Sequence, residues 1–174
     1  MRRIAPAVRL LAPVLLVALG AVASTARPAA AVGTWTWPVV GPVIRGFDAP
    51  DTPYGSGHRG IDVAVPVGTV LVAPAAGVVS FAGPVGGRVY VTIDHGGDVR
   101  STLSFLSATL VRRGDPVVAG QAVATSGDGH DGGSVPHLHL GVRLGDAYVD
   151  PLAYLSAPSV SGFVRLAPWD EPAA

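Results

Sequence analysis

Closely spaced glycine and proline residues constrain the fold of this 174-residue chain most, because they break it into short β-branched runs. The chain holds 23 glycines and 16 prolines. Many short strand-like runs with regular turn signals are typical of all-β sandwiches and barrel-like sheets. We therefore predict an all-β fold. The candidate strands are residues 43–47, 61–65, 69–72, 77–82, 88–94, 99–106, 121–125 and 137–144.

Two local signals refine this prediction. The sequence Asp-His-Gly-Gly at residues 94–97 joins two strand-like runs and predicts the tip of a hairpin. Asp150 followed by Pro151 provides an N-cap and a proline at the first helical position, so we expect one short helix over 150–155. Residues 157–174 lack periodicity and are predicted to form a flexible tail.

The amino terminus has the composition of an export signal. Arg2, Arg3 and Arg9 form a basic region, and residues 10–23 form an apolar run interrupted by proline and glycine. Small residues follow, with plausible cleavage after Ala26 or Ala31, so we assign residues 1–31 to a secretory signal peptide. An uncleaved anchor is the competing interpretation, although a membrane span needs about 20 apolar residues. Export predicts a secreted or cell-wall-associated protein with no stable membrane span after cleavage.

Residues 32–156 then form one domain of ordinary size. The chain has no cysteine, which excludes disulfides, thiolate metal sites and cysteine nucleophiles. Four of its twelve basic residues lie in the predicted signal, whereas twelve acidic residues remain spread along the chain. The mature protein is therefore acidic, which argues against nucleic acid as a partner.

Three of the five histidines lie in two short motifs, His58-x-x-x-Asp62 and His137-x-His139. Side chains alternate along a strand, so His137 and His139 project from one face together. The first motif spans roughly 13 Å when extended, and the glycines around His58 give the freedom to bend that joint coordination requires. A catalytic zinc site takes about three imidazole or carboxylate ligands and keeps one open position. The alternatives are polar side chains without a metal and, for His137, a strand histidine without a catalytic role.

The motifs resemble the lysostaphin-type (LytM-like) zinc endopeptidases, which cut peptidoglycan cross-links. The resemblance runs in order from about Trp37 to Leu155, and its motifs lie at residues 57–62, 66–79, 93–96, 114–121 and 136–140. It implies a two-sheet, antiparallel, sandwich-like β fold with a substrate groove. It also implies that His58, Asp62 and His139 bind Zn²⁺, and that His137 acts as a general base or transition-state stabiliser.

One position departs from the family pattern. The family usually carries a second catalytic histidine in a Tyr-x-His-Leu sequence, where this chain has Leu103-Ser-Phe105-Leu106. Phenylalanine neither donates a hydrogen bond nor carries a proton, and loss of one such donor typically costs ~10²–10³ in rate. His130, in a glycine-rich loop at residues 127–133, is a hypothetical replacement for the missing donor.

The leading functional prediction is an exported zinc metalloendopeptidase that hydrolyses peptide bonds in the stem or cross-bridge of peptidoglycan. The alternative is a catalytically degenerate domain that binds peptidoglycan or regulates a cell-wall hydrolase partner, and Phe105 favours it. A third interpretation is a structural metal site, which would normally be closed by four protein ligands. That interpretation would gain weight if His137 were the fourth ligand.

Overall fold

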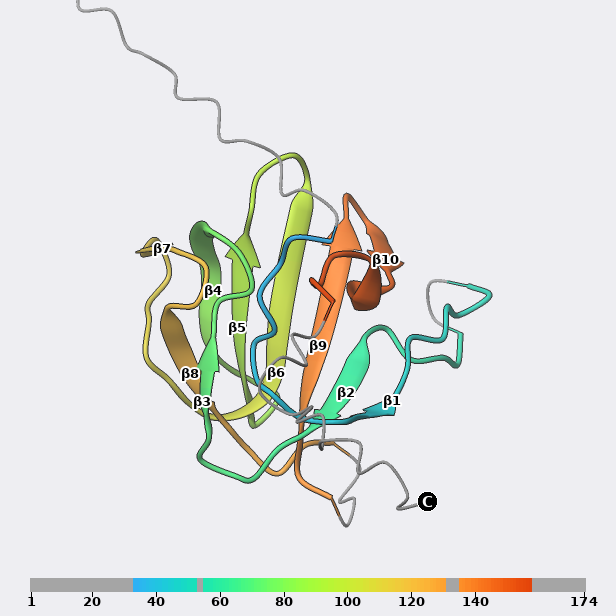
Figure 1. Cartoon of the computed structure of the whole chain (residues 1–174), viewed down its shortest axis with the longest axis horizontal. Coiled ribbons are helices and arrows are strands. Elements are labelled where there is room, and N and C mark those ends of the chain that lie inside the picture. The colour runs from blue at the N-terminus through green and yellow to red at the C-terminus, as the bar shows by residue number, and fades with distance from the viewer. Residues whose placement is uncertain (1–32, 53–54, 131–134, 158–174) are drawn as a thin grey trace, which may run out of the picture.

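The computed structural model describes residues 33–52, 55–130 and 135–157, which form an antiparallel β fold with one turn of 3₁₀ helix (Figure 1). The strands are β1 (Val43–Arg45), β2 (Ile61–Ala64), β3 (Val70–Val72), β4 (Gly77–Val85), β5 (Arg88–Asp94), β6 (Val99–Thr109), β7 (Pro116–Val117), β8 (Ala122–Ser126), β9 (His137–Leu144) and β10 (Ala147–Val149). The 3₁₀ helix, η1, covers Pro151–Ala153.

The strands follow the order β1-β2-β9-β6-β5-β4-β7, with β10 beside β9 and the β3–β8 ribbon attached to β6. Figure 1 shows the long strand β6 in the middle of this arrangement. The first part of β6 pairs with β9, and its last residues, from Leu106 to Thr109, pair with β8. The strands therefore form one continuous sheet of ten, whereas the sequence analysis expected two sheets, because β6 pairs with both β9 and β8 and joins the two parts.

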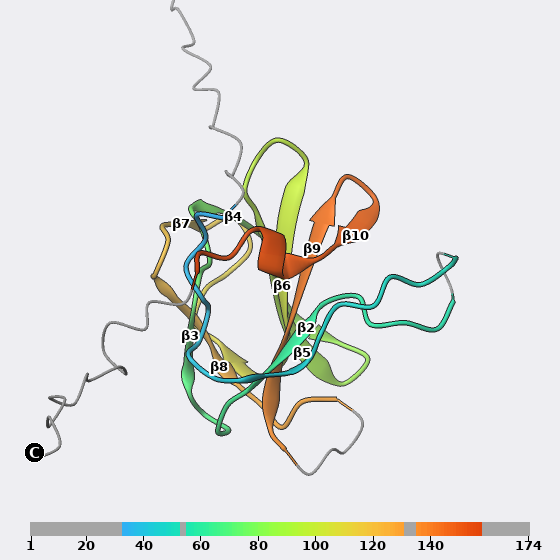
Figure 2. The same cartoon turned by 45° about the vertical axis from the view of Figure 1, so that its right-hand side comes forward.

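Alternate residues of the central strands build the core. Ile61 and Val63 of β2 and Leu138 and Leu140 of β9 are almost fully buried. Burial of each such side chain stabilises the fold by about 1.5–3 kcal/mol. The segment that precedes β1 crosses the sheet, as both views show (Figure 2), and it is anchored through Trp35, whose indole contacts other buried rings.

The all-β prediction is confirmed, and the expected strands 88–94 and 137–144 have the bounds of β5 and β9. Strands β4 and β6 extend beyond their predicted ends, and the short strands β7 and β10 were not predicted. The expected C-terminal helix is the single turn η1, with Asp150 as its N-cap. The predicted signal peptide and almost all of the predicted tail lie outside the described residues. None of the helical structure that is described is long and apolar enough to cross a membrane.

Candidate metal centre

The centre of the candidate site is a pair of residues on neighbouring strands. Asp62 of β2 lies opposite His139 of β9 in the antiparallel register, and the Nδ1 atom of His139 lies 2.8 Å from Oδ1 of Asp62. The backbone at Gly60 allows this close packing. A Cβ atom there would overlap the carbonyl oxygen of Leu140 and lie 2.7 Å from Nε2 of His139. A side chain at position 60 would therefore displace Leu140 or His139.

His58 reaches the pair from the loop before β2. Its backbone is paired with Asp48, and its Nδ1 atom lies 2.6 Å from the carbonyl oxygen of Gly46. A carbonyl accepts only, so Nδ1 carries the proton and the lone pair of Nε2 faces the site. That Nε2 atom lies 3.0 Å from Oδ1 of Asp62 and 3.1 Å from Nδ1 of His139. The chain thus bends between His58 and Asp62, as joint coordination requires.

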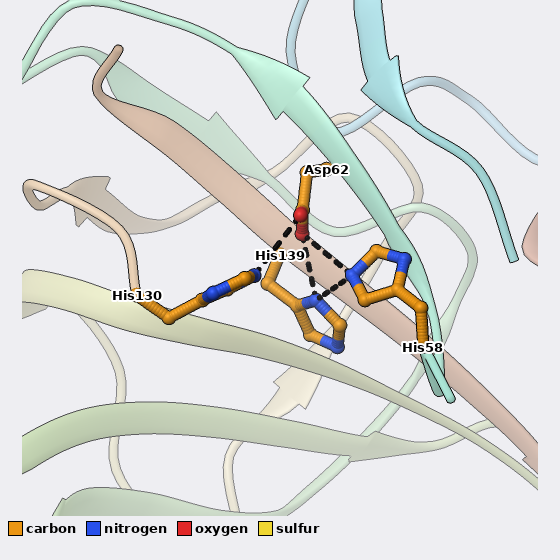
Figure 3. A group of neighbouring side chains, drawn as sticks. All are labelled: His58, Asp62, His130 and His139. Carbon is orange, nitrogen blue, oxygen red and sulfur yellow. Dashed lines mark hydrogen bonds and ion pairs between the residues drawn. The ribbon is translucent and has the colours of Figure 1, made fainter. Parts of the chain in front are cut away.

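His130 is the fourth member of the group. Its Nε2 atom lies 3.0 Å from Oδ2 of Asp62, the carboxylate oxygen that does not contact the other two imidazoles. Figure 3 shows His130 approaching Asp62 from the side opposite His58. One nitrogen or oxygen atom from each of the four residues lies within 4.8 Å of the others.

The geometry of these donor atoms fits a single zinc ion. Zinc bonds of about 2.0–2.1 Å in a tetrahedron place neighbouring ligand atoms roughly 3.3 Å apart. The donor atoms of His58, Asp62 and His139 are separated by 2.8–3.1 Å, so an outward shift of a few tenths of an ångström would admit the ion. Two imidazoles and one carboxylate form a donor set that zinc favours over calcium or magnesium.

The electrostatics of the group favour the ionised carboxylate of Asp62 and the neutral imidazole of His139. Burial by itself would raise the pKa of Asp62, but the hydrogen bond from His139 and the charges of the three neighbouring imidazoles outweigh it and lower the pKa to about 2. Burial lowers the pKa of His139, and the contact with Asp62 opposes this effect only partly. A carboxylate and a neutral imidazole are the forms that bind a metal ion.

The group lies on the wall of an open groove of about 500 Å³. His58, His130 and His139 line the groove together with two arginines, Arg45 and Arg59. Its remaining lining includes the aromatic side chains of Tyr90, Phe105 and Tyr148. The arginines and tyrosines were not singled out from the sequence, because isolated residues of these types carry no motif.

Phe105 lies beside the group in an unusual backbone conformation. Its φ angle is +62°, a left-handed value that is uncommon for a bulky residue and falls where β6 changes partners. Its ring centroid lies 6.0 Å from that of His139 and 5.3 Å from that of His130. An apolar ring therefore covers a side of the candidate metal centre that faces the groove.

His137 is not part of this group of four. It is buried; its Nδ1 atom lies 2.8 Å from the carbonyl oxygen of Val135, and its Nε2 atom accepts a 3.3 Å hydrogen bond from the backbone N–H of His130. Gly129 packs directly against the His137 ring and leaves no room for a Cβ atom. The sequence pattern predicts that His137 and His139 share a face of the strand. It does not predict that Gly129 and the backbone of His130 pack over the His137 ring.

Comparison with known proteins identifies the family. Residues 56–151, more than half of the chain, match peptidase family M23. The chain belongs to peptidase family M23. It is 36% identical over 135 residues to the murein hydrolase activator NlpD of Salmonella dublin, a match that covers 76% of this chain but only 34% of that relative. This chain therefore spans about a third of that protein's length.

Solved structures of peptidases share the fold. A zinc-containing peptidase from Vibrio cholerae superposes with a TM-score of 0.56 at 26% identity, covering 68% of this chain and 39% of that one. The catalytic domain of lysostaphin from Staphylococcus simulans gives a TM-score of 0.54 at 26% identity, with 62% and 86% covered. The resemblance to lysostaphin-type peptidases that the motifs predicted is confirmed.

Proposed function

We propose that this M23 member is an exported zinc metalloendopeptidase that hydrolyses peptide bonds of peptidoglycan. The observation that supports this most is the convergence of His58, Asp62 and His139 at an open groove. A site with three protein ligands on a groove wall has one side free for a substrate, which a purely structural zinc site does not need. The groove, of about 500 Å³, has the volume to hold a short peptide segment, and its arginines favour substrates with carboxylates.

In the proposed reaction, water adds to the carbonyl carbon of the scissile peptide, the C–N bond breaks, and a proton from that water passes to the leaving nitrogen. Zinc, when bound, polarises the carbonyl and makes water a stronger nucleophile at neutral pH. His58 presents Nε2 because Gly46 fixes its tautomer. Asp62 contributes the negative charge, and its partner His139 is held by the pairing of β2 with β9.

We assign proton transfer to His137, as its spacing from His139 suggests. In the described arrangement its Nε2 atom accepts the backbone N–H of His130, so this role requires that hydrogen bond to open. We also propose that residues 1–31 are a secretory signal, that residues 32–156 are the catalytic domain, and that residues 157–174 are a tail. Secretion to the cell wall would bring the domain to its polymeric substrate.

The second candidate is a non-cutting domain that binds peptidoglycan or regulates a cell-wall hydrolase. Phe105 favours it, because an apolar ring stands beside the metal group. The similarity to a protein named as a murein hydrolase activator also favours it, although this chain covers only a third of that protein. Retention of three convergent ligand atoms favours the enzyme, because regulation alone does not require them.

Release of peptides from purified peptidoglycan distinguishes the endopeptidase from the non-cutting domain. The zinc-loaded protein, without residues 1–31, is incubated with peptidoglycan, and new α-amino and carboxyl ends are identified by mass spectrometry. The matched variants are Asp62→Asn, at the site, and Asp146→Asn, whose side chain is fully exposed on the surface. We expect release by the wild type and by Asp146→Asn but not by Asp62→Asn. Absence of release from folded, zinc-loaded wild type would favour the regulatory function.

A further inference from the structure

We propose that His130 is a catalytic residue of this site, whose imidazole N–H donates to the scissile carbonyl oxygen as that oxygen gains negative charge. The proposal rests on the peptidase function proposed above. It is carried by the position of His130, a residue outside both metal-binding motifs, on the groove side of the metal group.

The hydrogen bond to Asp62 shows what the His130 ring can reach. Its Nε2 atom lies 3.0 Å from Oδ2, an anionic oxygen at the edge of the group. Ligand atoms around one zinc ion lie roughly 3.3 Å apart, so a substrate oxygen at the free position would be a near neighbour of the Asp62 carboxylate. A small rotation of the ring therefore transfers the N–H from one anionic oxygen to the other. The His130 side chain is 16% exposed, so it faces the groove without being fully solvated.

Phe105 explains why the hydrogen-bond donor on this side of the metal group is His130 and not residue 105. Its ring lies beside His139 and packs on the His130 ring, so residue 105 and His130 share one side of the metal group. A phenyl ring supplies no N–H. Among the described side chains of the group, His130 is the one that contacts the second carboxylate oxygen from this side.

Several contacts fix the backbone that carries His130. The guanidinium of Arg88 stands 5.1 Å from the centroid of the Phe105 ring and donates a 2.9 Å hydrogen bond to the carbonyl oxygen of Gly129. Gly129, with φ of +89°, packs directly against the His137 ring. A donor that is held in place before the reaction costs no reorganisation when charge develops, which is the arrangement that stabilises a transition state.

The same position would also suit a fourth metal ligand. The geometry favours the donor, because Nε2 contacts Oδ2, whereas His58 and His139 converge on Oδ1. A fourth ligand would hold zinc more tightly and would occupy the free position. The two roles therefore predict different results when His130 is removed: loss of a donor lowers turnover and leaves zinc affinity unchanged, whereas loss of a ligand weakens zinc binding.

The test compares His130→Ala and His130→Gln with wild type in three measurements. These are the zinc Kd by chelator competition, kcat and KM on a muropeptide that the wild type cuts, and the Kd of the same muropeptide with a phosphinate in place of the scissile amide. The phosphinate oxygens mimic the negatively charged oxygen of the transition state. Loss of a hydrogen-bond donor to that oxygen therefore weakens phosphinate binding and lowers kcat more than it changes KM. For His130→Ala we expect a ~10²–10³-fold loss of kcat and of phosphinate affinity. The zinc Kd and KM should stay within about threefold, and His130→Gln, which keeps an N–H, should lose less.

A rescue experiment tests whether a donor at residue 105 can replace His130, since the two residues lie on the same side of the metal group. The double variant Phe105→His/His130→Ala should regain at least about tenfold in kcat over His130→Ala, because histidine tolerates the left-handed backbone at residue 105. The matched control Phe105→Leu/His130→Ala should regain nothing. Equal kcat and phosphinate affinity in wild type and His130→Ala would overturn the donor role, and a zinc Kd weakened by more than tenfold would make His130 a ligand instead. Wild type that is zinc-loaded but neither cuts nor binds the phosphinate would overturn the peptidase function itself.

Discussion

Asp62 gives the metal-free protein a stability that depends on pH in a predictable way. Its carboxylate oxygens lie 2.8–3.0 Å from ring nitrogens of His58, His130 and His139, and its side chain is only 3% exposed. The folded protein therefore favours the ionised form, which is reflected in a pKa of about 2 against 3.8 for the unfolded chain. We predict that Asp62→Asn lowers the free energy of unfolding at neutral pH and that this loss fades in acid.

The magnitude follows from the displacement of the pKa. Each pKa unit corresponds to about 1.4 kcal/mol, so the ionised carboxylate of Asp62 contributes roughly 2 kcal/mol. Because the folded-state pKa is the lower one, this contribution is fully present above the unfolded value of 3.8 and is lost as the pH falls through 2. Asparagine has no titrating proton and mimics the protonated acid at every pH.

Urea unfolding of chelator-treated protein at pH 6.5, 5, 3.5 and 2 measures the effect. The gap between wild type and Asp62→Asn should be roughly 2 kcal/mol larger at pH 6.5 than at pH 2. Asp146→Asn is the control, because the side chain of Asp146 is fully exposed and its pair with Arg143 lies on the surface. A gap that stays constant with pH would refute the electrostatic account of Asp62.

Three further outcomes are expected. Gly60→Ala should lower stability by about 1–3 kcal/mol and weaken zinc binding, because its Cβ would overlap the Leu140 carbonyl and crowd His139; calorimetry with and without zinc measures both effects. Zinc at 100 times its Kd should stabilise wild type by about 2.7 kcal/mol, and a chelator should abolish that gain; an unchanged Tm would contradict a metal site. His95→Ala should lower stability by about 2–4 kcal/mol yet leave the zinc Kd unchanged, since the buried His95 ring bonds Ser101 and the Ala76 carbonyl and is not among the groove-lining residues; a loss of zinc affinity would contradict this purely structural role.

Much of the fold follows from local sequence. The strand at residues 137–144 and the turn at 94–97 carry their own signals, namely alternation and glycine-rich turn residues, and both lie where they were expected. Asp150 and Pro151 likewise specify a helical turn without help from the rest of the chain. The convergence of Asp62 with His139 is harder to foresee from spacing alone, because it depends on which strands pair, and the family resemblance supplied it.

The features that sequence reasoning missed depend on tertiary contacts. β6 extends to Thr109 because its last residues pair with β8, and no pattern within the run indicates a second partner. The left-handed backbone at Phe105 contradicts the preference of a bulky residue and is imposed where the strand changes partners. The position of His130 follows from a loop held by Arg88, so the sequence suggested it only as a hypothesis. The packing of Gly129 over the His137 ring depends on the same loop and was therefore also missed.

The pairing of β2 with β9 also sets when the candidate metal site can form. Asp62 and His139 are separated by 77 positions in the chain, and they meet only through the register of these two strands. Contacts of such long range close late in folding, since the entropy of closing the intervening loop must first be overcome. The three candidate ligand atoms come together only once β2 and β9 have paired, so we expect zinc uptake to follow completion of the sheet. A chain that folds with β2 and β9 one residue out of register would turn these side chains to opposite faces and would lack the candidate metal site.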